Sequence, residues 1–143
     1  VRERRLAAES LARVGLADYA ERQIGRLSGG QQQRVFLARA LAQEAEIYLL
    51  DEPMAGVDVR SQEEIFRVLA DLRRDGRIVV VVHHDLRTAA EWFDRVALID
   101  MRLVASGPTA DVLTPENLRR TYAGQLEILD EVGRAVAERG RTP

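Results

Sequence analysis

The sequence predicts an α/β fold in which a mostly parallel sheet is flanked by helices. Two continuous apolar runs, residues 47–50 and 78–82, are typical of strands that are buried on both faces of a parallel sheet. Between these runs apolar residues recur at helical spacing, namely Ile65, Val68, Leu69 and Leu72. This spacing predicts an amphipathic helix that ends at Gly76. Strand, helix and strand in this order predict a βαβ unit.

The residues before the first strand predict helices. Residues 2–14 carry an apolar stripe of Ala7, Leu11 and Val14 that stops at Gly15, and a short helical turn is expected over residues 16–22. Ser28 is placed to cap a long helix that runs to about Glu44. Its broad apolar face comprises Val35, Leu37, Ala38, Ala40 and Leu41.

Shorter elements are expected after the second strand. A helix is predicted over residues 86–93, followed by two short strands, 95–100 and 102–106, that can pair as a hairpin. We expect Trp92 and Phe93 of that helix to pack in a core. Small helices are expected to begin at Thr109 and Thr114, and a weak helical stripe runs from Ile128 toward a polar end at 139–143.

The composition excludes several classes of protein. The chain has 143 residues, of which 46% are apolar and 31% charged, and its net charge is −2. This balance is typical of a globular domain and does not indicate a nucleic-acid partner. Cysteine is absent, which excludes disulfides and thiolate metal sites.

All 21 basic residues are arginine, so the chain cannot contain a G-x-x-x-x-G-K-[ST] phosphate loop. Because Val1 leads directly into a helical pattern, we expect the chain to be a fragment; a start at an unusual codon is the alternative.

The first motif is Leu-Ser-Gly-Gly-Gln-Gln-Gln-Arg at residues 27–34. The cap at Ser28, followed by Gly29 and Gly30, places unshielded amides at the positive end of a helix, where an anion can approach closely. For the serine and glycines alone, an ordinary glycine-rich helix start is the better explanation. The motif therefore needs the rest of the string to indicate a function.

The second motif is the segment 51–58, which follows the first strand. Asp51 and Glu52 lie at the carboxyl end of that strand, where α/β sheets bind ligands, and could hold Mg²⁺ and activate a water molecule. Two acids that cap a turn before Pro53 are the alternative. Asp58 is placed to cap the next helix.

The third motif is His83-His84-Asp85, which follows the second strand. Histidines in this position commonly pack or bind the backbone. Neighbouring side chains of a strand face opposite ways, which argues against joint metal ligation by His83 and His84. Asp85 is placed to cap the helix that follows.

Together, in this order and at this spacing, these strings resemble ATP-binding cassette (ABC) ATPases. Residues 27–34 are similar to the family's signature motif, 51–52 to its Walker B motif with the catalytic glutamate, 55–58 to its D-loop, and His84 to its switch histidine. The resemblance runs to about Leu126. It implies a partial P-loop NTPase domain comprising the end of the helical subdomain (1–44), the ATPase core (45–107) and carboxy-terminal helices with a tail (108–143).

The resemblance also implies cofactors and residue roles. ATP and Mg²⁺ are the expected cofactors: Asp51 would hold the ion through water, Glu52 would act as general base and His84 would sense the γ-phosphate. Other residues would bind nucleotide across the interface of two ATPase domains that pair head to tail, namely Ser28, Gly29, Gly30, Gln31 and Asp58.

A narrower resemblance, in residues 51–58, 82–86 and 114–122, is to ATPase subunits of manganese, zinc or iron importers. It implies a homodimer, transmembrane permease subunits, a substrate-binding protein, and a peripheral location on the cytoplasmic face of the cell membrane. An inactive truncated ABC protein and a soluble ABC ATPase of DNA repair or translation are the alternatives.

The family's phosphate loop and glutamine loop have no counterpart in this chain. We therefore expect the chain alone neither to bind ATP tightly nor to hydrolyse it. The family's sheet places the phosphate-loop strand between the strand that ends at Val82 and the strand near residues 95–99. Without it we expect a gap or an exposed strand edge there.

Overall fold

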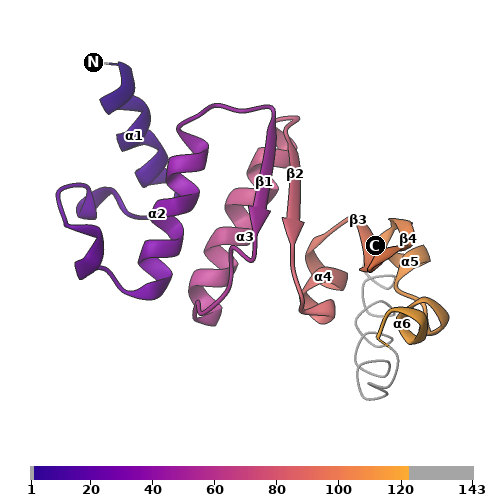
Figure 1. Ribbon diagram of the computed structural model, residues 1–143. Coiled ribbons are helices and arrows are strands. Elements are labelled where there is room, and N and C mark those ends of the chain that lie inside the picture. The colour runs from indigo at the N-terminus through magenta and orange to yellow at the C-terminus, as the bar shows by residue number, and fades with distance from the viewer. Residues whose placement is uncertain (1, 123–143) are drawn as a thin grey trace. The chain divides into compact units, whose positions relative to one another are not determined.

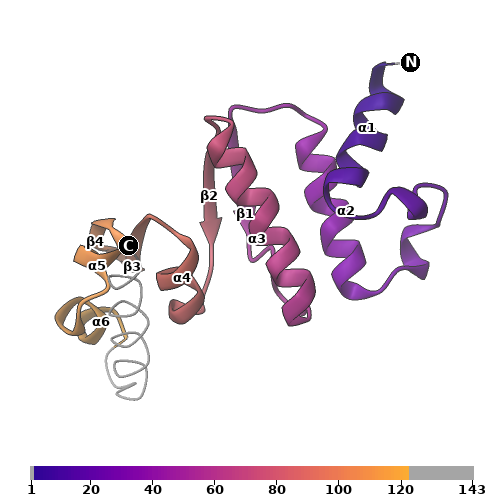
Figure 2. The same ribbon diagram turned by 180° about the vertical axis from the view of Figure 1, so that it is seen from behind.

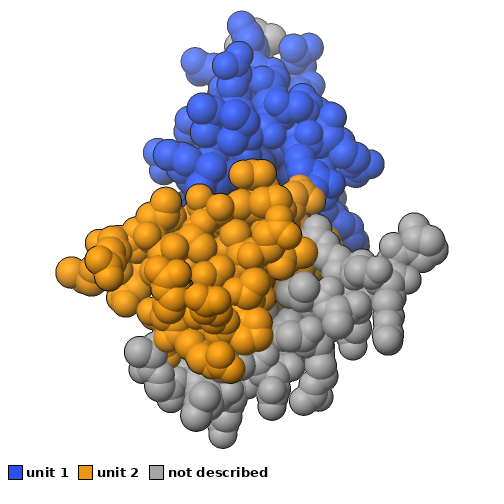
Figure 3. Space-filling view, turned by 90° about the vertical axis from the view of Figure 1, so that its right-hand side faces the viewer, with its two compact units in different colours: residues 1–82 blue, residues 83–143 orange. Residues whose placement is uncertain are grey.

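The computed structural model describes residues 2–122. The chain divides into two compact units, Val1–Val82 and His83–Pro143, which Figure 3 colours separately. The helical stripe expected from Ile128 and the polar end at 139–143 lie outside the described residues. Within residues 2–122, no helix combines the length and the apolar character needed to cross a bilayer.

The first unit contains four helical segments before its first strand. Figures 1 and 2 label the two longer ones, α1 and α2. They are α1 (Arg2–Arg13), the 3₁₀ turns η1 (Ala17–Tyr19) and η2 (Ile24–Arg26), and α2 (Gly29–Leu41). The predicted helices are confirmed, although η2 was not predicted. The helix expected to reach Glu44 ends at Leu41, and Glu44 adopts a positive φ of 50°, which a right-handed helix cannot include.

The rest of the first unit is the predicted βαβ unit. Strand β1 (Ile47–Asp51), helix α3 (Val59–Arg74) and strand β2 (Ile78–Val82) follow in order, and β1 pairs with β2 in parallel. The register joins Ile47 to Ile78 and Asp51 to Val82, so both strands end at the same edge of the sheet. Helix α3 packs beside the strands and buries one of their faces (Figures 1 and 2).

The expectation that these strands are buried on both faces is wrong for this structure. Tyr48 is buried, but the apolar residues on the opposite face of the sheet are between 49% and 76% exposed. They are Ile47, Leu49, Ile78, Val80 and Val82. A single helix can bury only one face of a sheet, and α3 lies on the side of Tyr48.

The second unit is built around an antiparallel hairpin. Helix α4 (Leu86–Trp92) precedes strands β3 (Arg95–Asp100) and β4 (Arg102–Pro108), and the short helices α5 (Thr109–Val112) and α6 (Pro115–Thr121) follow. Its buried core comprises Leu86, Ala90, Leu98, Val112, Leu113 and Leu118. Trp92 and Phe93, which we expected in a core, are only half-buried.

The expected mostly parallel sheet is not what the structure contains. Two separate two-stranded sheets are present within residues 2–122, one parallel and one antiparallel. Among the described strands β2 pairs with β1 alone, so the expected open strand edge exists. The βαβ unit dictates parallel pairing only for the strands that it joins, whereas the tight turn at Met101 makes β3 and β4 antiparallel.

Candidate functional site

Helix α2 begins with a capping box formed by Ser28 and Gln31. The backbone N–H of Gln31 donates to Ser28 Oγ at 3.3 Å, and the N–H of Ser28 donates to Gln31 Oε1 at 2.9 Å. Ser28 and Gly29 are exposed. The positive end of this 13-residue helix is therefore accessible, as the binding of an anion there requires.

Gly30 lies where the starts of α2 and α3 approach each other. A Cβ atom at this position would lie 3.1 Å from Ser61 Oγ and 3.3 Å from Asp58 Oδ2, both tighter than ordinary contact. A Cβ at Gly29 would lie 3.8 Å from the carbonyl oxygen of Gly56. The structure thus brings residues 28–31 and 55–58 together, and it gives Gly30 a packing reason to be glycine.

Asp58 is the N-cap of α3, as predicted. Its carboxylate accepts a hydrogen bond from the Ser61 backbone N–H at 3.1 Å. Hydrogen bonds from the side chain and the backbone of Ser61 lower the pKa of Asp58 below its ordinary value. The carboxylate therefore stays ionised at neutral pH and stabilises the positive end of the helix.

Asp51 ends β1 on the sheet face that α3 does not cover. Side chains alternate along a strand, so Asp51 shares its face with Leu49 and Ile47. Asp51 is exposed. A carboxylate in this position is a hard oxygen ligand at the carboxyl end of a parallel strand, and its chemistry fits Mg²⁺.

Glu52 follows in a strained backbone conformation. Its φ is +45°, a region that residues other than glycine seldom occupy and that is often found at functional sites. The surroundings hold this conformation: the Glu52 N–H donates to the Val82 carbonyl at 3.0 Å, and the Ala55 N–H donates to the Glu52 carbonyl at 3.0 Å. Gln33 Nε2 also donates to the Glu52 carbonyl, at 3.4 Å. The sequence predicts no role for Gln33, although its place within the string 27–34 is a signal.

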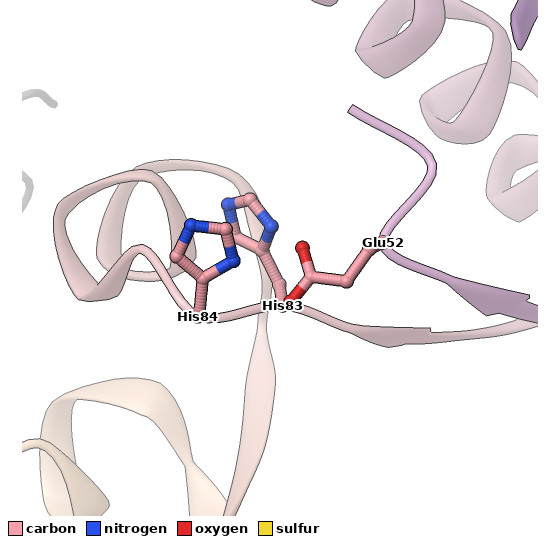
Figure 4. A group of neighbouring side chains, drawn as sticks. All are labelled: Glu52, His83 and His84. Atoms are coloured by element: carbon pink, nitrogen blue, oxygen red, sulfur yellow. The ribbon is translucent and has the colours of Figure 1, made fainter. Parts of the chain in front are cut away.

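His83 and His84 directly follow β2 and belong to the second unit, and Figure 4 shows them with Glu52, which follows β1. Their ring centroids lie 5.6 Å apart with the rings tilted by 44°. The expectation that they face opposite ways is therefore wrong. Side chains alternate between the two faces only within a strand. Because β2 ends at Val82, the two histidines lie outside the strand and their side chains need not alternate.

Arg34 is a structural residue that the motif did not reveal. Its guanidinium forms an ion pair with Glu64 of α3, and it donates to the Val14 carbonyl at 3.2 Å and to the Gly30 carbonyl at 3.4 Å. The Arg34 side chain is only 13% exposed and that of Glu64 30%. One side chain therefore connects the end of α1, the start of α2 and the middle of α3.

Replacing Arg34 with Ala is expected to lower the free energy of unfolding by about 2 kcal/mol, because Glu64 and two carbonyls lose a charged donor. Arg34→Lys should recover only part of this, since an ammonium lacks the planar fork that reaches several acceptors. Arg60→Ala is the control, because Arg60 pairs with the same carboxylate but is 89% exposed. It should change stability by about 0.5 kcal/mol or less. Urea unfolding of all three variants tests this, and equal losses in Arg34→Ala and Arg60→Ala would contradict it.

Asp85 caps α4, and its carboxylate accepts three hydrogen bonds. It accepts hydrogen bonds from the backbone N–H of Arg87 at 2.9 Å and of Thr88 at 3.3 Å, and from Thr88 Oγ1 at 2.6 Å. Burial alone would raise the pKa of Asp85. These hydrogen bonds, together with the charge of His83, nevertheless lower the pKa below the ordinary value of 3.8 for an aspartate.

Because the folded-state pKa of Asp85 lies below the unfolded-state value, its ionised form stabilises the fold above the unfolded pKa and ceases to do so as pH falls through the folded pKa. The unfolding free energy of the wild-type chain should therefore decline between neutral and strongly acidic pH by more than that of Asp85→Asn. Asparagine keeps a capping oxygen but carries no charge. Urea unfolding across this pH range measures the difference, and parallel pH profiles would show that the carboxylate charge contributes nothing.

Several known proteins are similar in sequence to this chain. Residues 2–55 match the family described as ABC transporter. The chain is 54% identical over 126 residues to the manganese transport system ATP-binding protein MntB of Bacillus subtilis, covering 88% of this chain and 50% of that protein. It is 47% identical over 125 residues to the zinc transport system ATP-binding protein TroB of Treponema pallidum, covering 87% of this chain and 47% of that protein.

A solved structure supports the fold. The ADP conformation of MJ1267, an ATP-binding cassette of an ABC transporter, superimposes with a TM-score of 0.77 at 25% identity, covering 87% of this chain and 51% of that one. The chain spans about half the length of the curated relatives it matches. It is therefore similar to ABC transporter ATP-binding proteins, and it has the α/β fold of part of an ABC ATPase domain.

Proposed function

We propose that this chain is part of the ATP-binding subunit of an ABC transporter that imports a metal ion, manganese or zinc. The observation that carries the proposal is the 54% identity over 126 residues to a manganese transport ATP-binding protein. Any stretch of that length includes residues 27–85, where the motifs lie. A zinc transport ATP-binding protein is nearly as similar, so both ions are included.

In this proposal the chain's residues position and activate the reactants of phosphoryl transfer. ATP supplies the transferred phosphoryl group and Mg²⁺ neutralises its charge, and the protein contributes mainly positioning and electrostatic stabilisation. Asp51 would hold the Mg²⁺ ion. Glu52 accepts the proton of the attacking water, and its strained backbone supports that role. His84 donates a hydrogen bond to the terminal phosphate.

A second ATPase domain completes each nucleotide site. The start of α2, with Ser28, Gly29, Gly30 and Gln31, faces the nucleotide of the partner, together with Asp58, which lies beside Gly30. The two domains pair head to tail and act with transmembrane permease subunits and a substrate-binding protein at the cytoplasmic face of the membrane. The division of the chain at residues 44 and 107 belongs to the same proposal.

The test compares this chain with a longer protein that joins it to the remaining half of the relatives' length. The longer protein should hydrolyse ATP and, with its permease, support uptake of radioactive manganese or zinc. The 143-residue chain alone should show no turnover above background, because it has no lysine and therefore no phosphate loop. Losing one oxyanion donor already costs about 10²–10³ in rate. Turnover by the chain alone that disappears in Glu52→Gln would refute this expectation, and a longer protein without turnover would refute the proposed function.

A further inference from the structure

Glu52 holds a backbone conformation that its neighbour in the sequence opposes. Its φ of +45° lies in the left-handed region, which residues other than glycine seldom occupy. Pro53 follows directly, and the residue before a proline favours extended backbone with a negative φ. Such a conformation persists only where the surrounding contacts fix it. Those contacts also set the direction of the carboxylate, because Cβ is bonded to the same Cα.

Hydrogen bonds hold the peptide groups on both sides of the Glu52 Cα. Two are main-chain bonds, from the Glu52 N–H to the Val82 carbonyl and from the Ala55 N–H to the Glu52 carbonyl, both at 3.0 Å. A further bond comes from Gln33 Nε2, which donates to the Glu52 carbonyl at 3.4 Å. A carbonyl oxygen has two lone pairs, so it can accept from Ala55 and Gln33 together.

Gln33 reaches this carbonyl from a helix that is itself fixed in position. On one side of it in α2, Gly30 closely approaches Ser61 of α3. On the other side, the Arg34 guanidinium forms an ion pair with Glu64 of α3. The backbone that carries Gln33 therefore has little freedom to move, and its side-chain amide is a fixed donor for the segment after β1.

The two preceding glutamines make different contacts. Gln31 Oε1 accepts from the Ser28 N–H in the capping box, and Gln32 Nε2 donates to the Leu27 carbonyl at 3.0 Å. Both bonds stabilise the start of α2 itself. Gln33 makes the bond that leaves the helix and joins residues 19 positions apart. A helix does not require an amide at this position, because methionine is an equally good helix former.

We propose that Gln33 is a positioning residue for ATP hydrolysis: its side-chain amide holds the Glu52 carbonyl and so directs the Glu52 carboxylate toward the attacking water. The inference rests on the proposed function, in which Glu52 is the general base. Without this contact the backbone of residue 52 can relax toward a negative φ, and the carboxylate then swings away with the Cα–Cβ bond. A displacement of about 1 Å can cost about 100-fold in rate.

The test introduces Gln33→Met into the longer protein that joins this chain to the remaining half of the relatives' length. Methionine is unbranched like glutamine and has a comparable helix propensity, but it has no N–H to donate. Gln62→Met is the matched control. Gln62 is also half-buried, and its Nε2 donates to the Val57 carbonyl at 3.1 Å, five positions away along the chain.

We expect Gln33→Met to lower kcat about tenfold, while the affinity for a fluorescent ATP analogue changes less than about twofold, because the contact acts on the base and not on the nucleotide. The loss should stay below 100-fold, since the main-chain bonds of Glu52 remain. Gln62→Met should retain the wild-type kcat. In a Glu52→Gln background, Gln33→Met should cause no further loss, because no base is left to position.

Hydrogen exchange of the Glu52 amide is a second readout, and it needs no turnover. This N–H is bonded to the Val82 carbonyl, so its exchange reports how often the backbone of residue 52 opens. We expect it to exchange about tenfold faster in Gln33→Met and at the wild-type rate in Gln62→Met.

Several outcomes would overturn the inference. They are an unchanged kcat in Gln33→Met, equal losses in the two methionine variants, and an additive loss in the variant that also carries Glu52→Gln. If the longer protein hydrolysed ATP and one of these held, the proposed function would stand and the inference would fail. A longer protein without turnover would count against the proposed function, and amide exchange would then decide: unchanged exchange in Gln33→Met overturns the inference, and faster exchange supports it.

Discussion

Replacing Glu52 with Gln in the longer protein that contains this chain is expected to reduce ATP turnover about 10²–10⁴-fold, the usual contribution of a general base. Glutamine keeps the size and one oxygen of the side chain but cannot accept a proton from water. The strained backbone conformation of residue 52 should be retained, because main-chain hydrogen bonds to Val82 and Ala55 hold it. ATP binding should therefore change little.

Steady-state phosphate release measures the turnover of this variant, and equilibrium binding of a fluorescent ATP analogue measures its affinity. Glu63→Gln is the matched control, since Glu63 is a carboxylate on the exposed side of α3. It should retain wild-type turnover. If Glu52→Gln and Glu63→Gln turned over ATP at the same rate, Glu52 would not be the base, and the proposed mechanism would have to place it elsewhere.

Replacing Ile65 with Ala is expected to lower the unfolding free energy of the chain by about 2–5 kcal/mol. Ile65 is only 1% exposed and lies in the middle of α3, the helix that packs against both α2 and the strands. The substitution removes buried methyl groups and leaves a cavity. Alanine is the better helix former, so the propensity change slightly offsets the loss.

Val59→Ala is the matched control for this variant. Val59 is also β-branched and belongs to the same helix, but it is 73% exposed, and its substitution should change stability by about 0.5 kcal/mol or less. Urea unfolding followed by circular dichroism compares the two. A smaller loss for Ile65→Ala than for Val59→Ala would mean that α3 does not hold the unit together.

Local signals in the sequence were sufficient to predict most of the helices and strands. Ser28, Asp58, Asp85 and Thr114 each cap the helix that their position predicted, because a cap involves only residues within three or four positions along the chain. The apolar spacing of residues 65–72 likewise predicted the buried stripe of α3. Glu44 is an exception, since its positive φ ends α2 earlier than the pattern indicated.

The candidate site was predicted in its residue types but not in its contacts. The string 27–34 indicated an anion-binding helix start, yet not that Gly30 lies against Ser61, that Gln33 reaches the backbone of Glu52, or that Arg34 joins three helices. Each of these contacts joins residues 19 or more positions apart. A single sequence does not show which distant residues meet.

The sequence by itself determined the βαβ unit, the helix caps and the resemblance to an ABC ATPase, because all three depend on the order and spacing of residues along the chain. Only the tertiary structure decided that His83 and His84 have neighbouring rings, and that α3 covers one face of the β1–β2 sheet and leaves the other exposed. The apolar runs predicted strands that are covered on both faces, and this prediction is wrong for the structure. Whether a face is covered depends on which other elements pack against it, and pattern along the strand carries no information about them.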